Sequence, residues 1–166
     1  MKKIIIVVSF LMGLLLVSCG SNGAGTLSSP IVFTTESGSV APDYAYHETT
    51  TISGDVMEIN RTGGSNIIVG DWRVTLTNAE ATHINGLLGL LNPVSDADIV
   101  SDKGPLGGGS MEIRIGDNVT FTNGYVHDEA TSSSRYHTFS PDVRNLADYI
   151  NTLLKKYGYY NKVMGT

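Results

Sequence analysis

The sequence predicts an α+β fold in which two helices pack on one face of an antiparallel sheet. Short runs that alternate apolar and polar residues recur along the chain, and turn signals separate them. Two longer segments carry apolar residues at helical spacing, each behind a residue suited to start a helix. The chain has a single cysteine, so no internal disulfide holds the fold and a hydrophobic core must do so.

The first half, residues 44–92, is expected to contain a hairpin, a further strand and a helix. Ser53-Gly54-Asp55 separates two strand-like runs and is typical of a hairpin turn. Ile67 to Leu76 supplies further β-type residues. Thr77 and Glu80 have the spacing of a capping box, so a helix begins here. Its apolar residues share one face: Ile84, Leu87, Leu88 and Leu91.

The second half, residues 110–158, follows the same order. Gly116-Asp117-Asn118 separates two alternating runs and indicates a hairpin. Ser140 and Pro141 are an N-cap and a first-turn proline, and Gly158 is expected to stop the helix that they begin. Lys155 and Lys156 lie in its last turn, where the helix dipole favours cations. Its apolar stripe consists of Val143, Leu146, Ala147, Ile150, Leu153, Leu154 and Tyr157.

The two halves align with each other, which favours a duplicated strand-hairpin-helix unit. Leu76 aligns with Phe139, and Ile84 with Leu146. The alternative is a chance likeness between two βα segments, since few residues are identical. Each helix has one apolar stripe, and the half-apolar strands are the only large surface that can cover it. We therefore expect both helices on the same face, with the glycine-rich run Gly104 to Ser110 as a connector.

The start of the chain has the three parts of an export signal. Lys2 and Lys3 precede an apolar stretch from Ile4 to Val17, and small residues follow it. The stretch is shorter than the about 20 residues that a membrane-spanning helix needs. Residues 1–18 are therefore interpreted as a signal peptide, and an uncleaved signal anchor is the alternative.

The residues Leu16-Val17-Ser18-Cys19 resemble the lipobox of bacterial lipoprotein precursors. The resemblance covers only this leader, and the family of the mature domain is not recognised. It implies cleavage before Cys19, a diacylglycerol on the sulfur and acylation of the new amino group. Two or three acyl chains on one residue give a lasting membrane anchor, whereas one chain gives only marginal attachment. The thiol of Cys19 would then be consumed.

After the anchor, residues 19–30 are expected to form a flexible tether because they are rich in Gly and Ser and carry no charge. Residues 31–166 are long enough for one α+β domain. The resemblance also bears on localisation in the cell envelope. Gly20 stands where an Asp would favour retention at the inner membrane, so the outer membrane is favoured if the host is Gram-negative. Whether the domain faces the periplasm or the cell surface stays open.

The charge of the chain excludes some partners. The net charge is −5 at pH 7, and cleavage would remove Lys2 and Lys3 and make the mature chain more acidic. An acidic chain without Lys/Arg clusters argues against nucleic acid and against docking on anionic lipid headgroups. The lipid on Cys19 is the expected membrane contact. The expected partner is another envelope protein or an envelope ligand.

No residue pattern points to a catalytic, metal or cofactor site. The four histidines never occur at the helical spacing of a metal site, and His127-Asp128-Glu129 fits a solvated loop tip better than a ligand set. The chain has no G-x-S-x-G motif. The glycine-rich run at Gly104 leads into a strand and lacks the lysine of a phosphate site. We assign no cofactor and no metal.

We therefore expect a binding or interaction domain rather than an enzyme. The candidate binding residues stand beside turns or strand ends: Trp72, Arg73, Tyr125 and Arg135. Trp72 is also a candidate core residue. One alternative is a small hydrolase with a scattered site, which a pocket joining His137 or His83 to a carboxylate would support. Another is a structural lipoprotein without a specific ligand.

Overall fold

The structure is a computed structural model that describes residues 27, 29–67, 69–93, 98–101, 103–105 and 108–157. The expected signal peptide, Cys19, most of the tether and Gly158 lie outside these residues. Within the described ranges, no helix combines the length and the apolar character needed to cross a bilayer.

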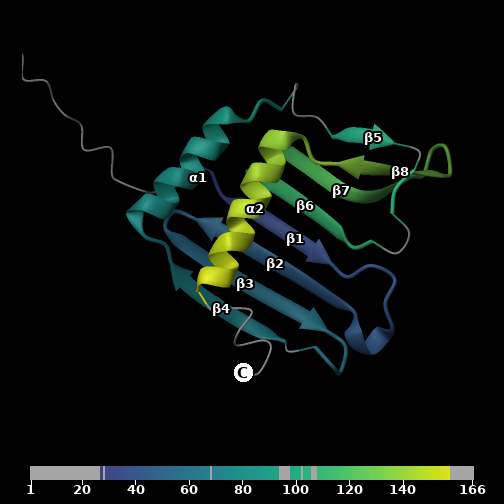
Figure 1. The fold of residues 1–166 in the computed structure, drawn as a ribbon, viewed down its shortest axis with the longest axis horizontal. Helices are drawn as coiled ribbons and strands as arrows, with labels where there is room; N and C mark the ends of the chain where they lie inside the picture. The colour runs from purple at the N-terminus through teal and green to yellow at the C-terminus, as the bar shows by residue number, and fades with distance from the viewer. Residues whose placement is uncertain are drawn as a thin grey trace, which may run out of the picture.

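Eight strands form one antiparallel sheet with the order β4-β3-β2-β1-β6-β7-β8-β5 (Figure 1). A short 3₁₀ helix, η1, precedes β2, and α1 and α2 follow β4 and β8. The elements are β1 (Ile31–Glu36), η1 (Pro42–Tyr44), β2 (Tyr46–Ser53), β3 (Val56–Gly63), β4 (Gly70–Thr75), α1 (Asn78–Leu90), β5 (Ile99–Ser101), β6 (Ser110–Ile115), β7 (Val119–Asp128), β8 (Ser133–Thr138) and α2 (Pro141–Lys156).

Both helices lie on the same face of the sheet, and α2 crosses its middle (Figure 1). The predicted α+β architecture is confirmed. The stripe predicted for α2 is the centre of the core, and six of its residues are buried: Val143, Leu146, Ala147, Ile150, Leu153 and Leu154. The strands supply the opposite side of this core through alternate positions: Ile31, Phe33, Ile52, Met57, Ile59, Ile113 and Phe121.

Helix α1 begins with the capping box that the sequence predicts. The Thr77 side chain accepts a hydrogen bond from the Glu80 backbone N–H, and the Glu80 carboxylate accepts one from the Thr77 backbone N–H. Ile84 is fully buried, whereas Leu87, Leu88 and Leu91 are only partly buried at the edge of the core. The apolar face of α1 therefore contributes less to the core than that of α2.

The two halves share their order of elements but not their handedness. In each half, three antiparallel strands precede a helix. β2 and β6 are both antiparallel to β1, which lies between them, so they run parallel to each other. The strands after β2 proceed to one edge of the sheet and those after β6 to the other, while both helices cover the same face. No rotation superposes such halves, so the likeness expected of a duplicated unit extends only to element order.

β7 changes partners at Gly124, and this bend shapes one end of the sheet. Residues up to Asn123 pair with β6, and residues from Gly124 pair with β8. Gly124 has a φ of +153°, and a Cβ there would lie 2.8 Å from Cβ of Ser110. Only glycine accommodates both this backbone conformation and the close approach of β6.

We expect the burial of α2 to dominate stability. Ile150→Ala removes a fully buried side chain and should lower the free energy of unfolding by about 2 to 5 kcal/mol. Leu88→Ala, at a partly buried position, should cost less, and Thr77→Ala should cost about 1 kcal/mol through the lost cap. Urea midpoints measure all three. A near-zero effect of Ile150→Ala would contradict the packing of α2 on the sheet.

Candidate functional site

The face of the sheet opposite the helices is polar. Side chains alternate along each strand, so the neighbours of the buried core residues point to this open face. Threonine and charged residues predominate there: Thr34, Glu36, His47, Thr49, Thr51, Glu58, Asn60, Asp71, Arg73, Glu112, Arg114, Thr120 and Thr122. The described strands therefore present no wide apolar patch on this face, and a partner that binds through apolar contacts is not favoured.

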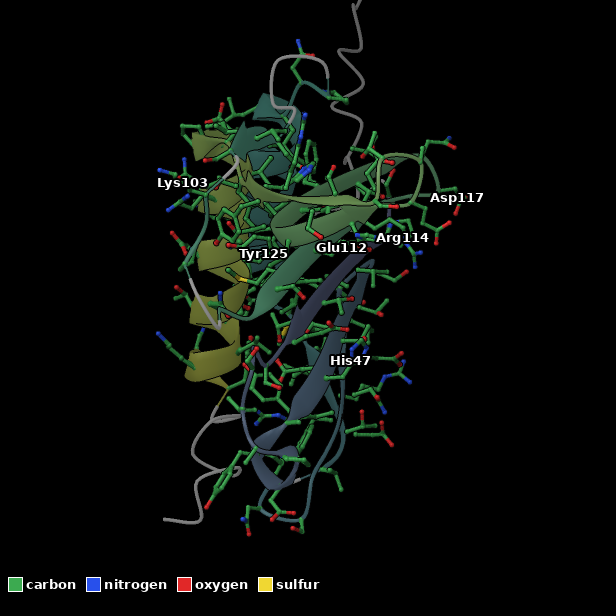
Figure 2. All side chains as sticks on the ribbon, turned by 90° about the vertical axis from the view of Figure 1, so that its right-hand side faces the viewer. His47, Lys103, Glu112, Arg114, Asp117 and Tyr125 are labelled. Carbon is green, nitrogen blue, oxygen red and sulfur yellow. The ribbon has the colours of Figure 1, made fainter. Side chains whose placement is uncertain are left out.

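The bend of β7 forms the wall of a groove of about 550 Å³ on this face. We call it the β7 groove. Its floor comes from β1, β2 and β6, and its wall from the second half of β7. It is lined by Thr34, Glu36, His47, Ser110, Met111, Glu112, Thr122, Tyr125, Val126 and His127. Figure 2 labels His47 and Glu112 on the flank that faces the reader, and it labels Tyr125 closer to the yellow helix α2.

A chain of hydrogen bonds crosses three strands at one end of the groove. Glu36 lies in register between His47 on β2 and Ser110 on β6. His47 Nδ1 donates to Glu36 Oε1 over 3.0 Å, and Ser110 Oγ donates to Glu36 Oε2 over 3.2 Å. Thr49 Oγ1 lies 3.2 Å from His47 Nε2. These contacts fix the Glu36 carboxylate, since each of its oxygens has a partner. Ser110 contacts the Glu36 carboxylate and not the His47 imidazole, so the two residues do not form the hydrogen-bonded nucleophile and base of a hydrolase.

The sequence-predicted binding residues do not form one site. Trp72 and Arg73 lie on β4 at one edge of the sheet, whereas Tyr125 and Arg135 lie on β7 and β8 near the other edge. The Trp72 side chain packs against the core, as its alternative interpretation expected. Arg73 is exposed and pairs with Glu58 over 3.4 Å. Trp72 and Arg73 border a cavity of about 390 Å³ on the open side of β2, β3 and β4.

Tyr125 is the one predicted binding residue that lines the β7 groove. Its side chain is 48 % exposed, and its ring meets Tyr136 of β8 edge to face, with 5.2 Å between the ring centroids. Tyr136 lines a cavity together with Arg144 and Asp148 of α2, so the paired rings of Tyr125 and Tyr136 lie on the helix side of the sheet and not on the open face. Arg135, the register partner of Val126, is exposed as well.

His137 is joined to a carboxylate, as the hydrolase alternative required. Its Nδ1 donates to Asp98 Oδ2 over 3.1 Å, and both side chains are mostly buried. Asp98 also accepts the backbone N–H of Thr122 through both oxygens, at 3.0 and 3.1 Å. Neither His137 nor Asp98 lines any of the five cavities described for the structure. The contacts therefore link β8 and β7 just beyond the end of their pairing.

The other sequence candidates are separate from one another. His127 and Asp128 are the last residues of β7, and His127 Nδ1 lies 3.2 Å from Ser134 Oγ. Hydrogen bonds from Thr131 and Ala130 instead engage Asp128 and lower its pKa. The His83 ring centre lies 4.3 Å from that of Tyr149 on α2, with the two ring planes tilted by 53°. Across the described part of the chain, no three His, Cys, Asp or Glu residues are grouped so that they could hold a metal ion.

Three buried charged residues on the helix side were not foreseen in these roles: Glu80, Glu48 and Arg61. Glu80 accepts hydrogen bonds from Lys156 Nζ at 2.7 Å and from the Tyr157 hydroxyl at 2.6 Å, in addition to its capping contacts. It thus ties the start of α1 to the end of α2. Glu48 and Arg61 are buried register partners on β2 and β3, and the Arg61 guanidinium lies 4.4 Å from the Tyr46 ring centre. In the sequence, Glu48 and Arg61 stand at positions that alternate in step with the apolar core residues of β2 and β3. A charge at such a position was the available signal for a buried ion pair.

The environment of Glu80 favours its ionised form. Burial raises its pKa, but the hydrogen bonds from Lys156 and Tyr157 oppose this effect. Together with those from Thr77, they lower the pKa of Glu80 from 4.5 to about 2. The sequence foresaw Glu80 only as a capping residue, because its second set of partners lies at the far end of the chain.

Comparison with protein-family models, with curated proteins and with solved structures finds no match to this chain. The functional argument therefore rests on the residues and the geometry described above.

Stability should depend on pH through Glu80. Because folding lowers its pKa, ionised Glu80 stabilises the fold above pH 4.5, and this contribution is lost as the pH falls toward about 2. We expect Glu80→Gln to lower the free energy of unfolding at pH 7 by about 1 to 3 kcal/mol. Urea unfolding as a function of pH should show the difference from the native chain shrinking in that window.

Lys155 and Lys156 provide a matched control for this prediction. Lys156→Gln removes a partner of Glu80 and should raise the pH at which the acid-sensitive stability is lost. Lys155→Gln, on the neighbouring exposed residue of the same helix turn, should leave that pH unchanged. Equal behaviour of the two variants would contradict the role of the Lys156 contact.

Proposed function

We propose that this chain is a lipid-anchored cell-envelope lipoprotein whose folded domain acts by binding and not by catalysis. The lipobox-like residues that end in Cys19 support the anchor. The observation that carries the binding role is the β7 groove on the open sheet face, where Glu36, His47 and Ser110 are fixed by hydrogen bonds. Polar groups held in fixed positions in a concave surface are typical of ligand sites.

The fold is compatible with a tether at this end of the chain. The described domain begins with Leu27 and Ser29, next to β1 in the centre of the sheet. Leu27 is partly buried and packs against the core, and its backbone N–H donates to the Gly54 carbonyl over 3.4 Å. The residues that link Cys19 to Leu27 would then separate the lipid from the domain.

The anchor predicts the behaviour of Cys19→Ala. This variant should lose labelled fatty acid and membrane partitioning, because Cys19 would carry the acyl chains. Its circular dichroism and urea midpoint should match those of the native chain, since Cys19 precedes the residues that form the core. Metabolic labelling with a fatty acid and membrane fractionation measure the effect. Incorporation of fatty acid by the Cys19→Ala chain would contradict the assignment of Cys19 as the anchor.

A small hydrolase is the second candidate, because His137 and Asp98 form the dyad that such a site needs. The same dyad has a structural explanation. Asp98 satisfies the backbone N–H of Thr122 where β8 no longer pairs with it, and His137 orients Asp98. A buried polar group requires such a partner, so the contacts are explained without a reaction.

Substitution of His137 separates the two functions. If the dyad is structural, His137→Gln should lower the free energy of unfolding by about 1 to 3 kcal/mol, and ligand binding should survive. The full chain and the variant are assayed with p-nitrophenyl acetate, and their urea midpoints are compared. Ester hydrolysis by the native chain that both His137→Gln and Asp98→Asn abolish would establish the hydrolase instead.

A further inference from the structure

A cavity of about 360 Å³ lies on the helix side of the sheet, on the opposite face from the β7 groove. α2 crosses the middle of the sheet, and beyond it no described helix covers β8 or β5 (Figure 1). The cavity occupies the corner between the flank of α2 and the strands β6, β7 and β8, and we call it the α2 cavity. Its polar lining consists of Asn123, Tyr136, Thr138, Arg144, Asp148 and Asn151.

Three of these residues form one face of α2. Arg144, Asp148 and Asn151 are spaced by about one helical turn and therefore project from the same side of the helix, next to its buried stripe. Asn123 of β7 and Thr138 of β8 face them from the sheet. Among the residues that the structure describes, no hydrogen bond or ion pair engages any of these five side chains, and Arg144 is not paired with Asp148. Their polar groups are therefore available to a ligand.

The base of the α2 cavity is apolar and fixed in position. Phe139 and Ala147 line it as buried members of the core. The Tyr136 ring is held by two neighbours, since it meets Tyr125 edge to face and Gly104 packs so closely that a Cβ there would clash with the ring. A preformed apolar base with a few polar groups around it is the usual construction of a small-molecule site.

The charges of the lining balance, and this limits the ligand. Arg144 offers only donors and repels cations, whereas Asp148 offers only acceptors and repels anions such as phosphates. The amides of Asn123 and Asn151 offer both functions. A ligand that engages all four side chains must donate and accept at several points without a net charge. Hydroxyl groups do both, and neighbouring hydroxyls on a ring hold these functions at fixed spacing.

A zwitterionic amino acid is the other class of ligand without a net charge. Its carboxylate and ammonium groups could bind Arg144 and Asp148, but the two amides on the opposite walls would then lack partners. A sugar ring supplies partners for all four, and its C–H groups can lie on the apolar base. The volume of the cavity is at the lower end of the range for small-molecule sites, about 300 to 1,000 Å³, which suits one or two sugar rings.

We infer that the α2 cavity binds a neutral sugar unit, which hydrogen bonds to Arg144, Asp148, Asn123 and Asn151 while its ring lies on the apolar base. The inference goes beyond the proposed function, because the cavity lies on the other face of the sheet and does not depend on what the β7 groove binds. Two sources supply this chemistry: a free sugar, and a sugar unit within a glycan chain.

The test uses the full chain in micelles of a polyoxyethylene detergent, which has no sugar head group that could compete. The probes are the methyl glycosides of glucose, galactose, mannose and N-acetylglucosamine, with the open-chain polyol sorbitol and the amino acid alanine as controls. Titrations followed by amide NMR shifts measure affinity and locate the site. We expect at least one glycoside to bind about tenfold tighter than either control, because its ring holds the hydroxyls in place. Shifts should centre on Asn123 and Asn151, and salt should have little effect because the ligand is uncharged.

Matched asparagines on α2 separate the cavity from the rest of the helix. Asn151→Ala removes a lining amide and should weaken binding of that glycoside about tenfold through the lost hydrogen bonds. Asn145→Ala, at an exposed position of the same helix outside the cavity, should change it less than about twofold. Asp148→Asn keeps an acceptor of similar shape and should weaken binding less than Asp148→Ala. Circular dichroism and urea midpoints establish that each variant is folded.

A linear trisaccharide of the same sugar distinguishes the two sources. Binding as tight as that of the methyl glycoside, or tighter, assigns the ligand to a glycan chain, whereas weaker binding assigns it to a free sugar.

Several results would overturn the inference. They are the absence of binding by every glycoside, equal binding of glycosides and sorbitol, binding of alanine alone, and equal effects of Asn151→Ala and Asn145→Ala. None of these results bears on the lipidation of Cys19 or on the β7 groove. The inference and the proposed function therefore fail separately.

Discussion

The burial of the α2 stripe against the sheet is the contact on which the rest of the structure depends. α2 crosses the middle of the sheet, and its residues from Val143 to Leu154 pack on strands of both halves. No internal disulfide supports the fold, because the chain has a single cysteine. The apolar area that α2 removes from water must therefore supply most of the stabilisation. Both helices share one face because only that face is apolar.

This asymmetry leaves the opposite face to solvent and to ligands. An antiparallel sheet with one face covered alternates inward apolar and outward polar residues, and the outward set here is rich in Thr, Glu and His. The bend of β7 at Gly124 turns part of that flat surface into a groove. A glycine is required there because the backbone has positive φ and Ser110 of β6 approaches closely. The second half of β7 thus forms one wall of the groove that Glu36 and Glu112 line.

Buried charges tie together elements that are far apart in the chain. Glu80 connects α1 to Lys156 and Tyr157 of the α2 end, and Glu48 meets Arg61 across β2 and β3. A buried carboxylate without partners would cost several kcal/mol or become protonated, so each such group needs a set of donors. The Glu80 contacts are satisfied only when the two helices meet in one arrangement, and the Glu48–Arg61 contact only in the observed register of β2 and β3.

The sequence by itself determined the features that depend on neighbouring residues. The hairpin turn at Gly54, the capping box of Thr77 and the α2 stripe all follow from spacing within one element, and the structure confirms each. Tertiary structure decided what depends on pairing between distant strands. The central place of β1 gave the two halves opposite hands, and strand register brought Glu36, His47 and Ser110 together. Local patterns carry no information on such register, because it is set by which strands become neighbours in the sheet.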